Sequence, residues 1–205
     1  MKDTKFGKVL IFINALVPLA LLLWDALGGQ LGANPQQFAL RTTGFLTIIF
    51  LFIGLAVTPL RRLTGRNELV KYRREIGLFA FFYSFLHLAT YFVFDRELKL
   101  GSVAADVWQR PFIAVGMAAF VMLVPLAVTS TNGMIKRLGG RRWQQLHRLV
   151  YPIAIAGVGH YYLIAKSDIL QPLGFAVVLA VLLGYRVYEN NQKPVNPAVT
   201  SIVAK

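Results

Sequence analysis

The chain has 205 residues, the length of a single domain, but its mean hydropathy of +0.56 and its charged fraction of only 15% exclude the soluble globular class. The formal net charge is +13, yet the basic residues stand in short clusters between long apolar runs. That pattern is typical of membrane topology and of contact with lipid, and it excludes nucleic acid as a partner. The absence of cysteine excludes disulfides, iron–sulfur clusters and thiolate zinc sites.

Six charge-free runs predict an all-α membrane protein with six transmembrane helices. An α-helix needs about 20 apolar residues to cross roughly 30 Å of hydrocarbon. The runs are Val9–Trp24, Thr42–Leu60, Ile76–Phe94, 111–129, Leu149–Ala165 and Ile169–Tyr185. The first run follows three lysines, as a signal peptide does, but Trp24 and Asp25 replace a small-residue cleavage site, so we expect a retained span. Residues 9–188 would form the transmembrane domain, between a short N-terminus (1–8) and a polar tail (189–205).

The distribution of Lys and Arg among the connections predicts the orientation. An excess of these residues marks the cytoplasmic side of a membrane protein. Seventeen lie in the N-terminus, the 61–75 loop, the 130–148 loop and the C-terminal end from Arg186 onward, and five lie in the alternate connections, at Arg41, Arg96, Lys99, Arg110 and Lys166. The sequence therefore predicts that both termini are cytoplasmic.

Two of the three histidines lie deep inside predicted spans. His87 and His160 each follow the last charged residue of the preceding loop by twelve positions, which is about 18 Å along a helix. Two imidazoles at one depth on neighbouring helices can supply both axial positions of a haem iron. A zinc site normally takes three or four ligands, and a proton path strings acids across the bilayer; the spans offer neither set. Histidines that only pack or gate, in a non-redox transporter or scaffold, stay the alternative.

His147 lies at the mouth of the fifth span, thirteen residues before His160. That offset places it about 20 Å lower on a straight helix, and about 140° around it. Arg73 and Arg74 occupy the matching level of the third span, so no histidine stands opposite. His147 is thus a ligand of a second haem iron without a histidine partner, or an anchor for an anionic group at the inner surface. Gly157 and Gly159 leave room beside His160 for a flat macrocycle.

Basic and aromatic residues of the loops are candidates for cofactor binding. Arginine side chains bind carboxylates and phosphates with good geometry. They can therefore hold haem propionates, a flavin phosphate or a quinone head group, although topology alone also demands basic loops. The candidate residues are Arg73, Arg74, Arg141, Arg142, Trp143 and Arg148. No catalytic residue is expected, since no nucleotide-binding or hydrolase motif is present.

Three segments carry a resemblance to a known family: TGFLTIIFLFIGLAVTPLRRL, YRREIGLFAFFYSFLHLATYF, and TSTNGMIKRLGGRRWQQLHRLVYP with the GHYYL around His160. Over residues 8 to 188 the chain resembles the MsrQ (YedZ) family of haem-binding membrane subunits. More distantly it is similar to ferric reductase and NADPH oxidase transmembrane domains, which carry two histidines, thirteen or fourteen residues apart, on each of two helices. The fifth span keeps that pair, His147 and His160, but the third span has only His87.

The resemblance implies a non-catalytic electron-transfer subunit of the bacterial inner membrane that holds one or two haem b groups. Electrons would come from the quinone pool, through bound FMN or with a cytosolic flavin reductase. They would leave on the periplasmic side to MsrP, a molybdopterin enzyme that reduces methionine sulfoxide and pairs with MsrQ as a heterodimer. A stand-alone transmembrane metal or quinone reductase is the alternative within redox chemistry.

Overall fold

The computed structural model describes residues 2–165 and 168–192, and within these ranges every regular element is helical. Lys166 and residues 193–205 of the predicted tail lie outside the described residues. The elements are α1 (Lys2–Leu27), α2 (Pro35–Thr64), η1 (Asn67–Tyr72), α3 (Arg73–Thr90), η2 (Tyr91–Asp95), α4 (Leu100–Gln109), α5 (Pro111–Val128), α6 (Asn132–Leu138), α7 (Gly140–His147), α8 (Val150–Ile164) and α9 (Leu170–Asn191).

Six of these helices contain the six predicted apolar runs. Five helical segments are long and apolar enough to cross a membrane: Thr4–Leu27, Pro35–Thr64, Asn67–Asp95, Pro111–Val128 and Leu170–Glu189. The remaining run forms α8, which has only 15 residues and is separated from α7 by a break at Arg148 and Leu149. The prediction of an all-α, multi-pass membrane protein is confirmed.

Local sequence signals set the ends of α2. The side chain of Asn34 accepts a hydrogen bond from the Gln37 backbone N–H at 3.0 Å, and Pro35 fits the first turn because proline needs no amide partner there. Gly65, at φ 69°, ends the helix in the left-handed conformation that glycine adopts without strain. The helix therefore begins seven residues before the apolar run, and Arg41 belongs to it.

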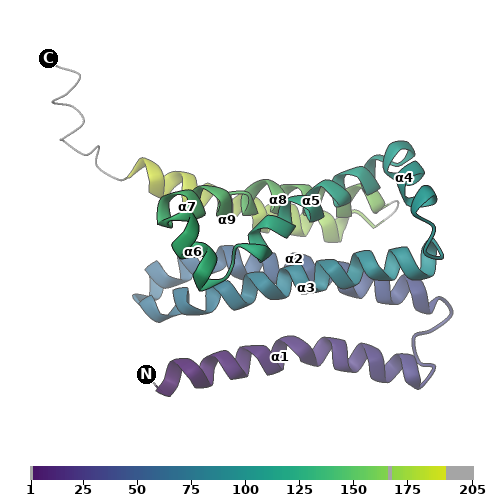
Figure 1. Ribbon diagram of the computed structural model, residues 1–205, viewed down its shortest axis with the longest axis horizontal. Coiled ribbons are helices and arrows are strands. Elements are labelled where there is room, and N and C mark those ends of the chain that lie inside the picture. Colours follow the sequence, from purple (N-terminus) through teal and green to yellow (C-terminus); the bar gives the residue numbers. More distant parts are fainter. Residues whose placement is uncertain (1, 166–167, 193–205) are drawn as a thin grey trace, which may run out of the picture.

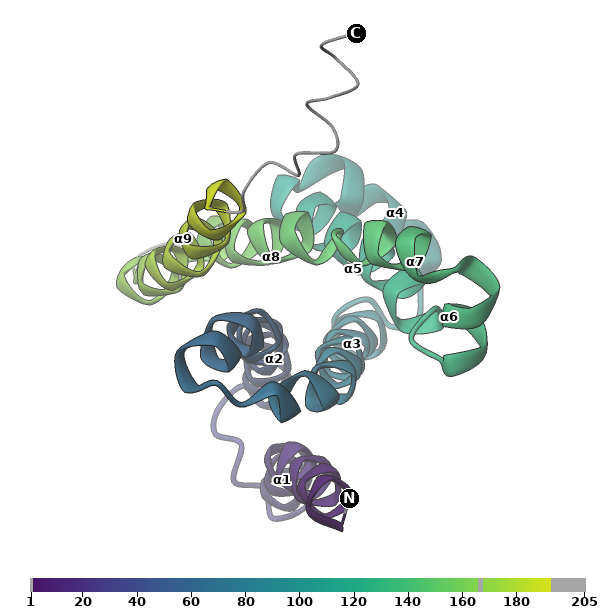
Figure 2. The same ribbon diagram turned by 90° about the vertical axis from the view of Figure 1, so that its left-hand side faces the viewer.

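The helices form three layers (Figures 1 and 2). Helix α1 lies alone on one side, α2 and α3 form the middle layer, and α5, α8 and α9 form the third. Within these layers α2 packs along α3, and α5 packs along α8. The helices of His87 and His160, α3 and α8, lie in adjacent layers.

The two ends of the bundle differ in charge. The start of α1, η1, α6, α7 and the end of α9 gather at one end, which we call the basic end. The opposite end holds the α1–α2 connection and α4, and we call it the α4 end (Figure 1). The two groups of connections that the charge count distinguished are therefore also separated in space.

Tyr83 fastens the peripheral α1 to the rest of the bundle. Its side chain is fully buried, stacks on Phe50 and donates a hydrogen bond from its hydroxyl to the carbonyl of Ala15 at 2.5 Å. We expect Tyr83→Phe to lower the free energy of unfolding by about 1 kcal/mol, because a buried hydrogen bond is lost. Thermal unfolding in detergent measures this loss. Tyr188→Phe, at a side chain that is 62% exposed, is the control and should change nothing; an equal loss in both variants would contradict the role of Tyr83.

Candidate functional site

His87 is fixed by the backbone of α2. Its Nδ1 lies 2.9 Å from the carbonyl oxygen of Leu40, and its ring rests against Gly44, one helical turn further along α2. A carbonyl can only accept a hydrogen bond, so Nδ1 must carry the proton and donate it. The other nitrogen, Nε2, is then the one with a free lone pair.

His160 is held in the same manner by α5. Its Nδ1 lies 2.6 Å from the carbonyl oxygen of Phe112, and its ring rests against Gly116. By the same argument Nδ1 donates and Nε2 keeps its lone pair. In both histidines Nε2 is therefore the nitrogen left to ligate a metal.

The two rings lie close together. Their centroids are 6.0 Å apart and their planes are nearly perpendicular, at 87°. An imidazole nitrogen lies roughly 2 Å from a metal that it ligates, so two imidazoles on opposite sides of one metal have centroids about 6 Å apart. The observed spacing thus fits one ion between His87 and His160. Within the described residues, no cluster of three or more His, Cys, Asp or Glu side chains could hold a metal.

The surroundings of the pair leave some open space. A Cβ atom added at Gly157 or at Gly159 would meet nothing within 4 Å, so these glycines of α8 face neither a neighbouring helix nor a side chain. His87 and His160 are themselves half-buried. These features are compatible with the sequence-based hypothesis that a flat group lies beside α8.

His147 lies apart from this pair, at the end of α7. Its ring stacks on Trp143 at 3.8 Å between centroids, Nδ1 lies 3.0 Å from the carbonyl of Trp143, and Nε2 lies 3.4 Å from the hydroxyl of Ser130. Burial holds the pKa of His147 below its ordinary value; the Trp143 carbonyl acts against this shift and the charge of Arg73 acts with it. The break after α7, at Arg148 and Leu149, separates His147 from α8, which carries His160.

The candidate loop residues all lie at the basic end, but they do not form one cluster. Trp143 donates from Nε1 to the Thr129 carbonyl at 2.9 Å, which attaches α7 to the end of α5. Arg74 donates to the side chain of Asn132 at 2.5 Å. Arg73 begins α3 close to His147, whereas the remaining three, Arg141, Arg142 and Arg148, are exposed.

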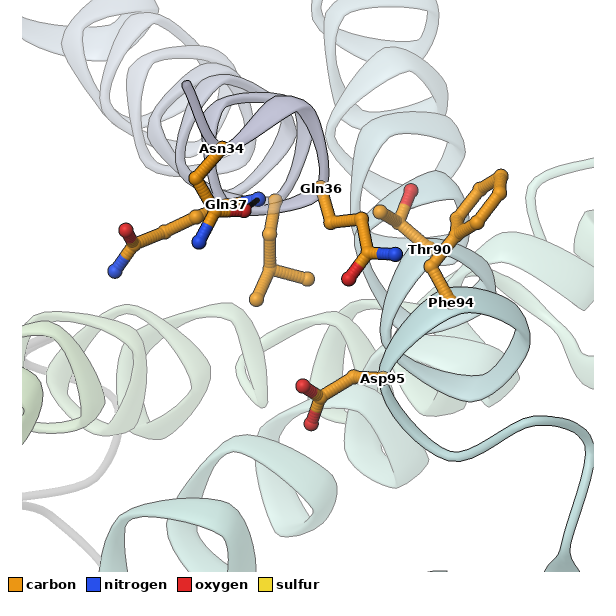
Figure 3. Close-up of a pocket in the computed structure, with 7 residues that line it drawn as sticks. Asn34, Gln36, Gln37, Thr90, Phe94 and Asp95 are labelled. Carbon is orange, nitrogen blue, oxygen red and sulfur yellow. Dashed lines mark hydrogen bonds between the residues drawn. The ribbon is translucent and has the colours of Figure 1, made fainter. Parts of the chain in front are cut away.

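A polar pocket opens at the α4 end beside the histidine pair. It has a volume of about 200 Å³ and lies between the start of α2 and the end of α3, with Leu40 in its wall (Figure 3). Its other lining residues are Asn34, Gln36, Gln37, Thr90, Phe94 and Asp95. Leu40 therefore lines this pocket and also accepts the His87 hydrogen bond through its carbonyl oxygen.

Arg186 is a further residue of the basic end that the sequence analysis counted only as a topological charge. From α9 it donates to the Leu55 carbonyl at 3.1 Å and to the Thr58 hydroxyl at 3.2 Å, and it also bonds the Tyr151 hydroxyl. It therefore ties α9 to α2 and α8. A lone arginine beside an apolar run was the only signal in the sequence for this role.

Comparison with known proteins finds a matching family and several similar relatives. Residues 41–158 match the family described as ferric reductase like transmembrane component. The chain is 52% identical to a protein of Herminiimonas arsenicoxydans over 91% of this chain and 86% of the relative, and 47% identical to one of Ralstonia nicotianae over 91% and 87%. A protein of Rhodospirillum rubrum is 48% identical over 91% and 90%. Each relative is named protein-methionine-sulfoxide reductase heme-binding subunit MsrQ.

Proposed function

Because the chain belongs to the MsrQ family of ferric reductase-like transmembrane proteins, we propose that it is the haem-binding, electron-transferring membrane subunit of a methionine sulfoxide reductase system. The observation that carries this proposal is the pair of facing imidazoles, His87 and His160, with ring centroids 6.0 Å apart. A haem b held between them would supply a one-electron carrier inside the membrane. The protein itself holds the ligands, orients them and keeps water away.

The tautomer of the two histidines supports axial ligation. The Nδ1 protons of His87 and His160 are engaged in hydrogen bonds to the carbonyl oxygens of Leu40 and Phe112, so Nε2 is the nitrogen that faces iron. An imidazole that donates such a hydrogen bond is also a more basic ligand and cannot rotate freely. The pairs α2–α3 and α5–α8 thus fix the orientation of both imidazoles independently of any bound metal.

The proposed direction of electron flow follows from the two ends of the bundle. We infer that the basic end is cytoplasmic, since an excess of Lys and Arg marks that side of the inner membrane. Quinol, or FMN reduced by a cytosolic flavin reductase, would donate electrons there, where exposed Arg141, Arg142 and Arg148 offer sites for a phosphate or another anionic group. His147, next to Arg73, would serve at this end as the ligand of a second haem or as an anchor.

The proposed acceptor lies at the α4 end. His87 and His160 are in the last turns of α3 and α8, whose C-terminal ends point toward that end (Figure 1). A periplasmic molybdopterin partner of the MsrP type, paired with this chain as a heterodimer, could therefore approach the site closely. The pocket that Asn34, Gln37 and Asp95 line also has Leu40 in its wall, and the carbonyl of Leu40 accepts the His87 hydrogen bond.

Spectroscopy of the purified protein tests the proposal. We expect a Soret band that shifts on reduction by a quinol, and reoxidation when the molybdopterin partner and methionine sulfoxide are both added. Addition of the partner without methionine sulfoxide is the control, and it should reoxidise at most an amount of haem stoichiometric with the partner. Protein without a reducible haem spectrum would contradict the proposal; haem that reduces ferric iron or a quinone but never the partner would favour a stand-alone reductase.

A further inference from the structure

Two glycines, Gly44 in α2 and Gly116 in α5, lie directly against the two imidazoles. A Cβ atom added at Gly44 would lie 3.0 Å from both Nδ1 and Cε1 of His87. One added at Gly116 would lie 2.7 Å from Nδ1 and 2.8 Å from Cε1 of His160. Both distances are shorter than ordinary van der Waals contact, so any other residue would displace the ring.

The carbonyl that fixes each ring lies one helical turn before the glycine. Leu40 precedes Gly44 by four residues, and Phe112 precedes Gly116 by four, so carbonyl and glycine share one face of their helix. The missing side chain lets the ring approach the helix surface, and the carbonyl then accepts its Nδ1 proton. The two features work together, because a ring held away from the helix could not reach the carbonyl.

The same device occurs in both helix pairs. Gly44 lies 43 residues before His87 and Gly116 lies 44 residues before His160, and each glycine is on the helix that packs along the histidine-bearing helix. No other described glycine lies against a histidine, although a Cβ atom added at Gly7 would clash with the side chain of Tyr72. A Cβ at Gly54 would meet only Ile76 at 3.7 Å, and one at Gly77 would meet nothing within 4 Å.

We propose that Gly44 and Gly116 are positioning residues that set the orientation and the basicity of the two axial imidazoles; this inference rests on the proposed haem-binding function. Alanine at either position moves the ring away from the carbonyl by a few tenths of an ångström, which weakens the Nδ1 hydrogen bond. A weaker hydrogen bond makes the imidazole a poorer electron donor to iron. The ferric state of the haem then loses more stabilisation by its ligands than the ferrous state, so the midpoint potential of the haem rises.

Gly44→Ala and Gly116→Ala test the inference, with Gly54→Ala as the matched control on α2. We expect haem loss to a haem-scavenging protein to become about tenfold faster in both variants, the usual effect of removing an outer hydrogen-bond partner of a metal ligand. The effect should be larger for Gly116→Ala, where the contact is tighter. The midpoint potential should rise and the low-spin EPR signal should shift in both variants, and Gly54→Ala should match wild type.

A second measurement separates ring positioning from simple helix packing. If the alanine at position 44 disturbs only the imidazole, its effect on thermal unfolding disappears when His87 is also replaced. The double variant Gly44→Ala/His87→Ala should therefore unfold at the same temperature as His87→Ala. The same holds for Gly116→Ala with His160→Ala. An equal loss of stability with and without the histidine would overturn the inference, because the glycine would then serve the helix contact itself.

The wild-type protein distinguishes the two possible failures. Wild type without haem would overturn the proposed function and this inference together. Wild type with haem, and with Gly44→Ala and Gly116→Ala indistinguishable from Gly54→Ala in haem loss, potential and EPR, would overturn the inference alone.

Discussion

Replacing either His87 or His160 with alanine is expected to abolish the same low-spin haem signal completely. The two rings lie 6.0 Å apart and the third histidine, His147, contacts Trp143 and Ser130 instead, so it does not replace a lost ligand. Each single variant should therefore lose the six-coordinate spectrum, and the double variant should look like either single one. Absorbance and EPR spectra of purified protein, normalised to protein concentration, measure the effect.

His147→Ala is the control for this experiment. His147 stacks on Trp143 at the basic end, and its nitrogens contact Trp143 and Ser130 instead of the histidine pair. The signal assigned to His87 and His160 should survive its replacement largely intact. Equal loss of that signal in all three variants would refute the assignment of distinct roles to the three histidines.

Asp106→Ala is expected to destabilise the α4 end. The buried carboxylate of Asp106 accepts a hydrogen bond from the Tyr91 hydroxyl at 2.5 Å and pairs with Arg96 at 2.5 Å and with Arg110 at 3.3 Å. It therefore holds α4 on the π-helical turn η2, which follows the helix of His87. We expect a loss of about 2 kcal/mol in the free energy of unfolding, since a half-buried arginine and a tyrosine lose their partner. Thermal unfolding in detergent measures it.

Glu97→Ala is the matched control for Asp106→Ala. Glu97 belongs to the same connection and pairs with Lys99 at 2.7 Å, but their side chains are 74% and 69% exposed. Exposed ion pairs contribute little because water screens both charges. Glu97→Ala should unfold at the same temperature as wild type. If Asp106→Ala also unfolded at that temperature, the Asp106 carboxylate would not be the group that holds α4 in place.

Much of the fold was predictable because lipid imposes a simple rule on sequence. A charge-free run of about 20 residues in a membrane protein has to be helical, so the six runs predicted where the long helices lie. The charges of the loops predicted which connections gather at each end of the bundle. The closeness of His87 and His160 was also predictable. Both helices leave the basic end, and equal offsets of twelve residues along helices of constant rise reach one depth.

The backbone contacts of the site were not predictable in the same way. Gly44 and Gly116 carry no chemistry of their own, and the sequence alone attributes glycines in spans to helix packing. Their role depends on which helices are neighbours and on how each is rotated, which no single run of residues reveals. The nearly equal spacing between each glycine and its histidine was the available signal, and it acquires meaning only once the pairs α2–α3 and α5–α8 are known.

Helix α4 and the cluster around Asp106 escaped prediction for a different reason. The segment between the third and fourth runs is short and charged, so its composition indicates a loop. Its helix forms because Asp106 can pair with Arg96 and Arg110 while it bonds Tyr91, and these contacts join residues that come together only after η2 ends α3.

Low-temperature EPR of the oxidised wild-type protein shows whether His87 and His160 bind one iron, because the line shape reports the angle between two imidazole planes on the same iron. Perpendicular planes leave the two iron orbitals that share the unpaired electron nearly equal in energy. With ring planes at 87°, we expect a strongly anisotropic low-spin signal in which one feature dominates. A high-spin signal, from iron with one histidine or none, would contradict the claim that His87 and His160 bind the same iron.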